Sequence, residues 1–213
     1  MKISQAVYSK EEEKANAITH ALGFLFSLIS IPFLLYFGYR NSTMVGVVGI
    51  WIYGFSLLLS MACSTIYHYE MDPIRKVLLK KFDHISIYFL IAGTYTVLIL
   101  NMMFFTEALY YLVGLWSMAL VGIWFKWYYV QRFKFLSTLI YVLMGYLLLL
   151  DPWMFFRSLS RPADLMLITG GVFYTVGAGF YLWKSRKWTH TIWHILVLLG
   201  AGFHFAAFLH ELM

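Results

Sequence analysis

The sequence predicts an all-α membrane protein, a bundle of seven transmembrane helices. Of its 213 residues, 62% are hydrophobic and only 12% are charged, which is about half the charged fraction of an ordinary soluble domain. Apolar runs of roughly 18 residues or more recur along the whole chain, the length that crosses the hydrocarbon layer of a membrane. The basic residues gather at alternate connections between these runs, as they do in multi-pass membrane proteins.

The polar start of the chain and the apolar remainder define two regions. Residues 1–17 are polar and charged, so we expect no cleavable signal peptide and predict a cytoplasmic N-terminal segment. Residues 18–213 form the seven-helix transmembrane domain. The single cysteine, Cys63, lies inside an apolar run, which excludes a disulfide within the chain.

Each apolar run is interpreted as one helix, and the short connections predict antiparallel neighbours. The fifth run is the shortest and ends at Asp151–Pro152, a stop signal. The glycines of the sixth run, within residues 168–179, suit close helix packing in lipid. In chain order, the predicted helices are residues 18–38, 44–67, 82–103, 107–126, 134–150, 163–183 and 188–210.

The basic residues set the orientation. Thirteen of the sixteen lysines and arginines fall on the side of the N-terminus, and only Arg40, Arg157 and Arg161 fall on the other. Because cytoplasmic loops carry the positive excess, the N-terminus is predicted to be cytoplasmic and the C-terminus outside. The net charge of +6 therefore reflects membrane orientation, and no nucleic-acid partner is expected. The thirteen are Lys2, Lys10, Lys14, Arg75, Lys76, Lys80, Lys81, Lys126, Arg132, Lys134, Lys184, Arg186 and Lys187.

Several polar side chains interrupt the cytoplasmic ends of the apolar runs. Ser64 and His68 close the second run, Asp83 opens the third, and His190 and His194 open the seventh. The predicted topology places all five at one depth, in the inner-leaflet half of the membrane. Ionisable residues are costly at this depth and usually serve a function.

The spacing of these residues predicts a zinc site. Residues i and i+4 share a helix face, so His190 and His194 can hold one metal ion, with His68 as the third ligand. Three protein ligands and a fourth position for water form the catalytic arrangement of zinc. Ser64 shares the face of His68, and Asp83 can accept a hydrogen bond from that water or from a ligand imidazole. A lone histidine at a helix end is more often an interfacial residue, but the pair and the shared depth favour a site.

The remaining histidines are not among the predicted zinc ligands. His204 lies roughly 15 Å beyond His194 at the helical rise, so it is expected to form a hydrogen bond inside the bundle rather than to bind the same metal. His210 is expected at the membrane interface. His20 can serve as an outer partner of the site, and the role of His84 stays open.

These residues carry a family resemblance over nearly the whole chain. The sequence resembles the hemolysin III family, the bacterial branch of the progestin and adipoQ receptors, within a superfamily that includes alkaline ceramidases. The resemblance implies that zinc is held by His68, His190 and His194, with Ser64 and Asp83 as polar partners. One departure is Val97, where the family often has proline. The motifs are "EKANAITH" (residues 13–20), "STIYH" (64–68), "FDH" (82–84), "AGTYT" (92–96) and "HTIWHILVLLGAGFHF" (190–205).

Two functions fit these residues about equally well, and the first is a zinc-dependent hydrolase of lipid amides in the inner cell membrane, like the ceramidase relatives. Asp83 would act as the general base, and Ser64 with the zinc would stabilise the oxyanion. One alternative is a receptor-like or membrane-homeostasis protein whose zinc is structural. Another is a pore-forming cytolysin, against which the sequence shows no charged residue in mid-span and no helix with a strongly polar stripe. The expected partners are membrane lipids; the substrate and the oligomeric state are not predicted.

Overall fold

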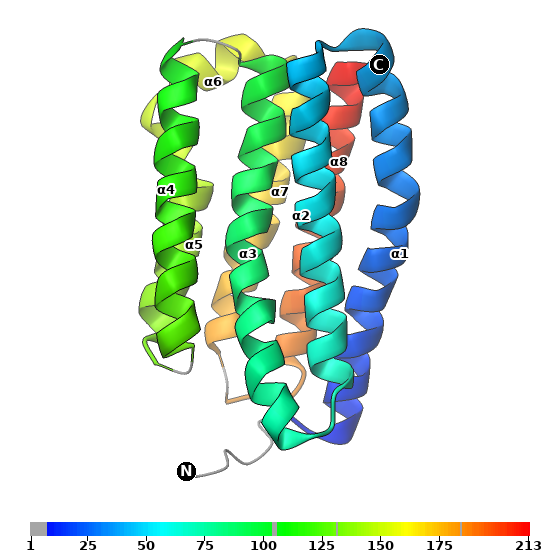
Figure 1. The fold of residues 1–213 in the computed structure, drawn as a ribbon, viewed down its shortest axis with the longest axis vertical. Coiled ribbons are helices and arrows are strands. Elements are labelled where there is room, and N and C mark those ends of the chain that lie inside the picture. Colours follow the sequence, from blue (N-terminus) through cyan, green and yellow to red (C-terminus); the bar gives the residue numbers. More distant parts are fainter. Residues whose placement is uncertain (1–7, 104–105, 131, 184) are drawn as a thin grey trace.

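The computed structural model describes residues 8–103, 106–130, 132–183 and 185–213, and it contains no strand among them. Its long helices run side by side along the longest axis, and the short α6 lies at one end of the bundle (Figure 1). The first helix begins and the last helix ends at opposite ends of the bundle (Figure 1). The elements are α1 (Lys10–Asn41), α2 (Met44–Tyr69), α3 (Pro73–Met102), α4 (Thr106–Tyr129), α5 (Lys134–Gly145), the 3₁₀ helix η1 (Leu147–Leu150), α6 (Pro152–Ser158), α7 (Arg161–Leu182) and α8 (Thr189–Leu212).

The apolar helices confirm a multi-pass membrane protein. Among the described residues, six helices are long and apolar enough to cross a membrane: α1, α2, α3, α4, α7 and α8. The predicted fifth helix, residues 134–150, is divided into the 12-residue α5 and η1. Two of the basic residues in the orientation argument, Lys2 and Lys184, lie outside the described residues.

The short α6 was not predicted, because the turn before it was interpreted only as a stop. Asp151 also has the side chain of an N-cap, and its Oδ1 accepts a hydrogen bond from the Met154 amide at 3.0 Å. Pro152 then occupies the first turn, where its missing N–H has no cost. The same dipeptide therefore ends one helical stretch and begins the next.

The first helix begins earlier than predicted, at Lys10. The Ser9 Oγ accepts from the Glu12 amide at 3.2 Å, and the Glu12 Oε2 accepts from the Ser9 amide at 3.0 Å. This reciprocal pair is a capping box, which satisfies two amides at the start of a helix. Residues 10–17 of the predicted N-terminal segment are therefore helical, and they extend α1 beyond its apolar run.

The interior of the bundle holds polar side chains as well as an apolar core, and large apolar side chains also cover the outside. Large hydrophobic residues such as Ile29, Val121 and Phe135 are more than 60% exposed, which suits helices that face lipid. The buried polar residues include Asn16, His20, Ser60, Ser64, His68, Asp83, His190 and His194. The last helix, α8, packs against both α1 and α7. The buried polar residues of α1 and α8 therefore lie close together.

Close helix contact depends on a small residue at the α2–α3 boundary. A Cβ atom at Gly49 would lie 3.2 Å from the Thr96 carbonyl oxygen and 3.3 Å from the Val97 Cα. Glycine therefore lets α2 and α3 approach closely.

Candidate metal centre

Three buried histidines converge at one end of the bundle. His68 lies in the last turn of α2, and His190 and His194 lie one turn apart at the start of α8. The Nε2 atom of His190 is 3.3 Å from that of His68 and 3.1 Å from that of His194. One ligand atom from each residue lies within 4.8 Å of the other two. The three histidines named from the sequence therefore form one cluster.

The outer nitrogen of each histidine has a partner of its own. The His68 Nδ1 is 2.6 Å from Glu13 Oε2, the His190 Nδ1 is 3.0 Å from the Tyr8 hydroxyl, and the His194 Nδ1 is 3.5 Å from Thr19 Oγ1. Glu13 can only accept when it is ionised, so Nδ1 of His68 carries the proton. Thr19 donates its own proton to the Asn16 carbonyl at 2.8 Å, so it accepts from His194. With a proton on each Nδ1, the three Nε2 lone pairs would face one another.

The donor set fits a tetrahedral metal ion. Zinc binds histidine nitrogen at about 2.0–2.1 Å, which separates two ligand nitrogens of a tetrahedron by about 3.3 Å. The separations of 3.1 and 3.3 Å in the cluster match this value. Metal-binding histidines also donate their second N–H to a carboxylate, carbonyl or similar group. Three neutral imidazoles with bonded outer nitrogens can therefore hold a metal; imidazole suits zinc, copper, iron and nickel.

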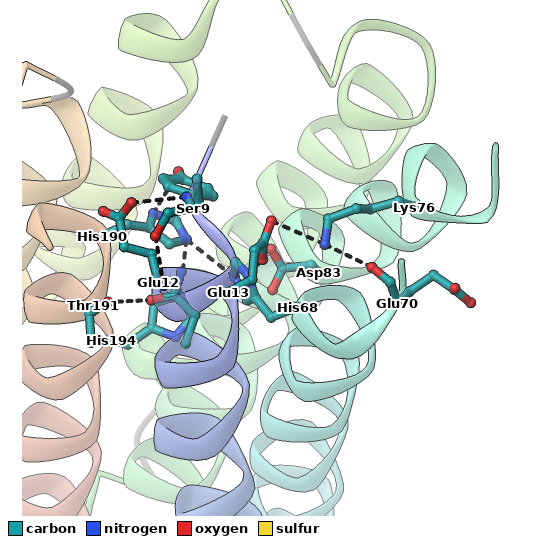
Figure 2. Close-up of polar contacts among 12 residues, drawn as sticks. Ser9, Glu12, Glu13, His68, Glu70, Lys76, Asp83, His190, Thr191 and His194 are labelled. Carbon is teal, nitrogen blue, oxygen red and sulfur yellow. Dashed lines mark hydrogen bonds and ion pairs between the residues drawn. The ribbon is translucent and has the colours of Figure 1, made fainter. Parts of the chain in front are cut away.

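Glu13 is a member of this site that the sequence reasoning missed. Its Oε2 contacts His68, and its Oε1 lies 3.1 Å from the Nζ of Lys76 (Figure 2). Lys76 also donates to the Glu70 carbonyl at 2.9 Å. Glu13 therefore links His68 of α2 to the first turn of α3. One feature of the sequence could have identified Glu13. It lies one turn before Asn16 and two turns before His20, so the three residues share a face at the start of the first helix.

Two hydrogen bonds hold the start of α8 against α1. Glu12 Oε1 accepts from the Trp188 amide at 2.8 Å, and Asn16 Oδ1 accepts from Thr191 Oγ1 at 2.6 Å. Trp188 has a left-handed backbone, with φ 66°, and no side-chain cap of its own. The Glu12 side chain of α1 therefore accepts a hydrogen bond at the start of α8, where α8 has no side-chain cap of its own. The two bonds fix the direction in which His190 and His194 point.

Tyr8 covers His190 just before α1 begins. Its ring stacks on the imidazole with centroids 4.5 Å apart and planes at 25°, in addition to the hydroxyl contact. Burial raises the pKa of the Tyr8 hydroxyl well above its usual value, and the neighbouring Glu13 carboxylate adds to the rise. The hydroxyl therefore stays protonated at physiological pH. Tyr8 lies in the predicted N-terminal segment and was not singled out from the sequence.

Asp83 and Ser64 are buried near the cluster, in different surroundings. The Asp83 Oδ2 lies 3.5 Å from the Nδ1 of His84, and the residue borders a cavity. The carboxylate that bonds a ligand imidazole is Glu13. The Ser64 Oγ is buried and has no hydrogen-bond partner among the described residues. Ser60, one turn earlier on α2, borders the cavity.

The cavity next to Asp83 has a volume of about 150 Å³. A second cavity of about 140 Å³ shares several of its lining residues, His204 among them. Both lie between α3, α5, α7 and α8, and the walls of both are mainly apolar. The first cavity is bordered by Asp83 and His20. None of the three clustered histidines lines it, but His20 packs against His194, so this part of the cavity lies next to the cluster.

The other histidines lie outside the cluster. The His204 Nε2 bonds the Leu167 carbonyl at 3.2 Å, which confirms the expected hydrogen bond inside the bundle. The His84 Nδ1 lies 2.9 Å from the Lys80 carbonyl, and its Nε2 lies 3.0 Å from the Tyr181 hydroxyl. His210 is exposed. His20 packs edge-on against His194, with ring centroids 3.9 Å apart.

Comparisons with known proteins show which family the chain resembles. A family model described as haemolysin-III related matches residues 8–205. The chain is 40% identical to a hemolysin-3 homolog of Bacillus subtilis (strain 168) over 92% of each chain. It is 35% identical to hemolysin-3 of Bacillus cereus over 96% of this chain and 93% of that protein. It is also 28% identical to the human monocyte to macrophage differentiation factor, over 74% of this chain and 67% of that protein. No solved structure gave a significant match.

Proposed function

Because the chain belongs to the haemolysin-III related family, we propose that it is a zinc-dependent hydrolase of lipid amides. The observation that carries the proposal is the cavity that is bordered by Asp83 and by His20, which packs against His194 of the histidine cluster. Hydrolysis adds water across the amide C–N bond and releases a fatty acid and an amine. The proposed zinc ligands are His68, His190 and His194.

The residues around the cluster have chemically distinct tasks. When bound, zinc supplies a Lewis acid that polarises a carbonyl and lowers the pKa of water. Asp83 orients the attacking water and accepts its proton, and it then returns that proton to the leaving amine. The hydroxyl of Ser64, which has no partner among the described residues, stabilises negative charge on the carbonyl oxygen. Glu13, Tyr8 and Thr19 contact the outer nitrogens of the three imidazoles, and when they accept a proton from Nδ1 they leave Nε2 for the metal.

The shape of the cavity supports a lipid substrate. The adjoining cavities bordered by His204 extend from the polar end near Asp83 to Phe155 and Leu167. An acyl chain suits apolar walls of this kind, and an amide group suits the polar end. The proposed site lies within the membrane domain, so the substrate would enter from the lipid rather than from water. We propose the inner cell membrane as the location.

Fatty-acid release tests the proposal. Purified protein loaded with zinc is incubated in detergent with a panel of ceramides and N-acyl ethanolamines, and the released fatty acid is quantified by mass spectrometry. We expect release from at least one class of substrate, loss of release after chelation, and recovery when zinc is restored. A zinc-loaded protein that cleaves no member of the panel would contradict the proposal for these substrates.

A structural zinc is the second candidate, and one observation favours it. The cluster and its partners connect α1, α2 and α8, so a metal here would hold the bundle together whether or not it catalyses a reaction. Such a protein would act as a receptor or in membrane homeostasis. Substitution of Asp83 distinguishes the two candidates, as described in the Discussion.

We also propose seven membrane crossings with a cytoplasmic N-terminus. The 12 residues of α5 and the four of η1 together extend roughly 26 Å at the helical and 3₁₀ rises, close to the thickness of the hydrocarbon core of about 30 Å. The ends of α1 and α8 support an odd count, because they lie at opposite ends of the bundle (Figure 1). The excess of basic residues on the side of α1's start supports the orientation.

Cysteine labelling tests this topology. In a Cys63→Ser background, Lys76→Cys and Lys187→Cys should be protected from a membrane-impermeant maleimide in intact cells. Arg161→Cys should be labelled, because it lies at the opposite end of the bundle. All three should react after the membrane is permeabilised. Labelling of Lys76→Cys and Lys187→Cys from opposite sides would exclude the seven-helix arrangement.

A further inference from the structure

His20 is a buried imidazole without a hydrogen bond. It lies on α1, one turn after Asn16, and is only 3% exposed. Neither its Nδ1 nor its Nε2 has a hydrogen-bond partner among the described residues. Buried polar side chains are almost always hydrogen-bonded, and each exception requires an explanation. The three metal ligands differ from it in this respect, because each has a bonded outer nitrogen.

The position of His20 indicates where a partner would come from. Its ring packs against His194 at 62° between the ring planes, and the residue borders the same cavity as Asp83. The group of residues with converging ligand atoms consists of His68, His190 and His194, without His20. His20 therefore stands between a metal ligand and the polar end of the cavity, and a molecule in that cavity is its available partner.

The chemistry of a neutral imidazole defines that partner. One ring nitrogen donates a hydrogen bond and the other accepts one. A lipid amide whose carbonyl carbon reaches the water oriented by Asp83 brings its carbonyl oxygen to the same end of the cavity. Negative charge develops on this oxygen during hydrolysis, and a fixed donor in an apolar site stabilises it more strongly than water does.

We infer that His20 is a substrate-contacting residue whose N–H donates a hydrogen bond to the carbonyl oxygen of the lipid amide. The inference rests on the proposed hydrolase function and assigns the recognition of the amide to a residue of α1. It also explains why a polar side chain is kept without a partner in the interior. The cost of that burial is recovered when the carbonyl binds.

The substitution His20→Leu separates this role from a structural one. Zinc content should be unchanged, because the three ligands and their outer partners remain. The melting temperature should be unchanged or higher, because the variant removes a buried polar group that lacks a partner. Turnover should fall by about 10²–10³, the range for loss of one oxyanion donor. His20→Gln, which keeps an N–H donor, should recover part of the activity.

Infrared spectroscopy supplies a readout that does not need turnover. The probe is N-hexadecanoylethanolamine with a ¹³C-labelled carbonyl, whose stretching band moves to lower frequency when the oxygen accepts a stronger hydrogen bond. We expect this displacement in the zinc-loaded wild-type protein and its loss in His20→Leu. His204→Leu is the matched control, because it removes another histidine that borders the cavity, and it should leave the displaced band in place.

The outcomes distinguish the inference from the proposed function. A displaced band in a wild-type protein that never cleaves the probe contradicts the hydrolase and supports the contact. Cleavage with the same band in wild type and His20→Leu supports the hydrolase and overturns the inference. Absence of a displaced band in the wild type overturns the inference as well. If His20→Leu and His20→Gln both lose zinc or melt well below the wild type, His20 is a structural residue and the inference is wrong.

Discussion

The variant His194→Ala is expected to lose its bound zinc and to melt about 5–10 °C below the wild-type protein. A ligand that binds only the folded state at about 100 times its Kd stabilises that state by about 2.7 kcal/mol. In a chain of this size, each kcal/mol shifts the melting temperature by about 2–4 °C. The effect should be large because the metal would connect α8 to α2. Elemental analysis and thermal unfolding in detergent, with and without zinc, measure both quantities.

His190→Ala should behave in the same way. Two further variants serve as a negative control and as a variant with a partial effect. His210→Ala removes an exposed histidine from the same helix and should change neither zinc content nor melting temperature. Glu13→Gln keeps the size of the side chain but weakens the hydrogen bond to His68, so it should reduce zinc affinity by about 10–100-fold. Unchanged zinc content in both alanine variants would remove His190 and His194 from the site.

The second large effect is expected for Asp83→Asn. The variant keeps the shape and one hydrogen bond of the side chain but removes the base. If the zinc is catalytic, the metal should stay bound, because the three histidines and Glu13 are unchanged, while lipid-amide turnover should fall by about 10² or more. Zinc content, melting temperature and fatty-acid release are measured on the same preparations.

The opposite pattern would identify a structural zinc. In that case Asp83→Asn should reduce zinc affinity or the melting temperature, and the wild-type protein should release no fatty acid. Asp164→Asn is the matched control, because Asp164 is another buried carboxylate on a membrane helix, α7. It should not affect turnover. Loss of zinc from Asp83→Asn, with no release by the wild type, would contradict the hydrolase and leave the structural candidate.

Hydrophobicity predicted the helices well where the helix and the apolar run coincide, and poorly where they do not. The predicted second helix, residues 44–67, agrees with α2 within two residues. The starts of α1 and α3 were placed eight and nine residues too late, because their first turns are polar. Capping patterns at Ser9–Glu12 and at Asp72–Pro73 were available in the sequence and depend on side-chain hydrogen bonds rather than on hydrophobicity.

The candidate site was predicted from residue spacing and topology, but its outer partners were not. An i, i+4 pair fixes which residues share a helix face, so His190 and His194 could be paired without a structure. The depth assigned to His68 then brought it to the same level. No spacing rule connects Glu13 with His68, since these residues are 55 positions apart and meet only because α1 extends beyond its apolar run.

The meeting of α1 with α8 has a consequence for biogenesis. His68 and His190 are separated by 122 residues, and Tyr8 and His190 by 182. A chain is synthesised from its N-terminus. The first three helices, with His68, are therefore made before His190 and His194 exist. A metal ion held by all three histidines could be enclosed only after the last helix has inserted and docked. If the protein is the proposed hydrolase, a chain that stops before Trp188 would carry the base but neither ligand of α8, so a partly synthesised protein would not cleave the lipids around it.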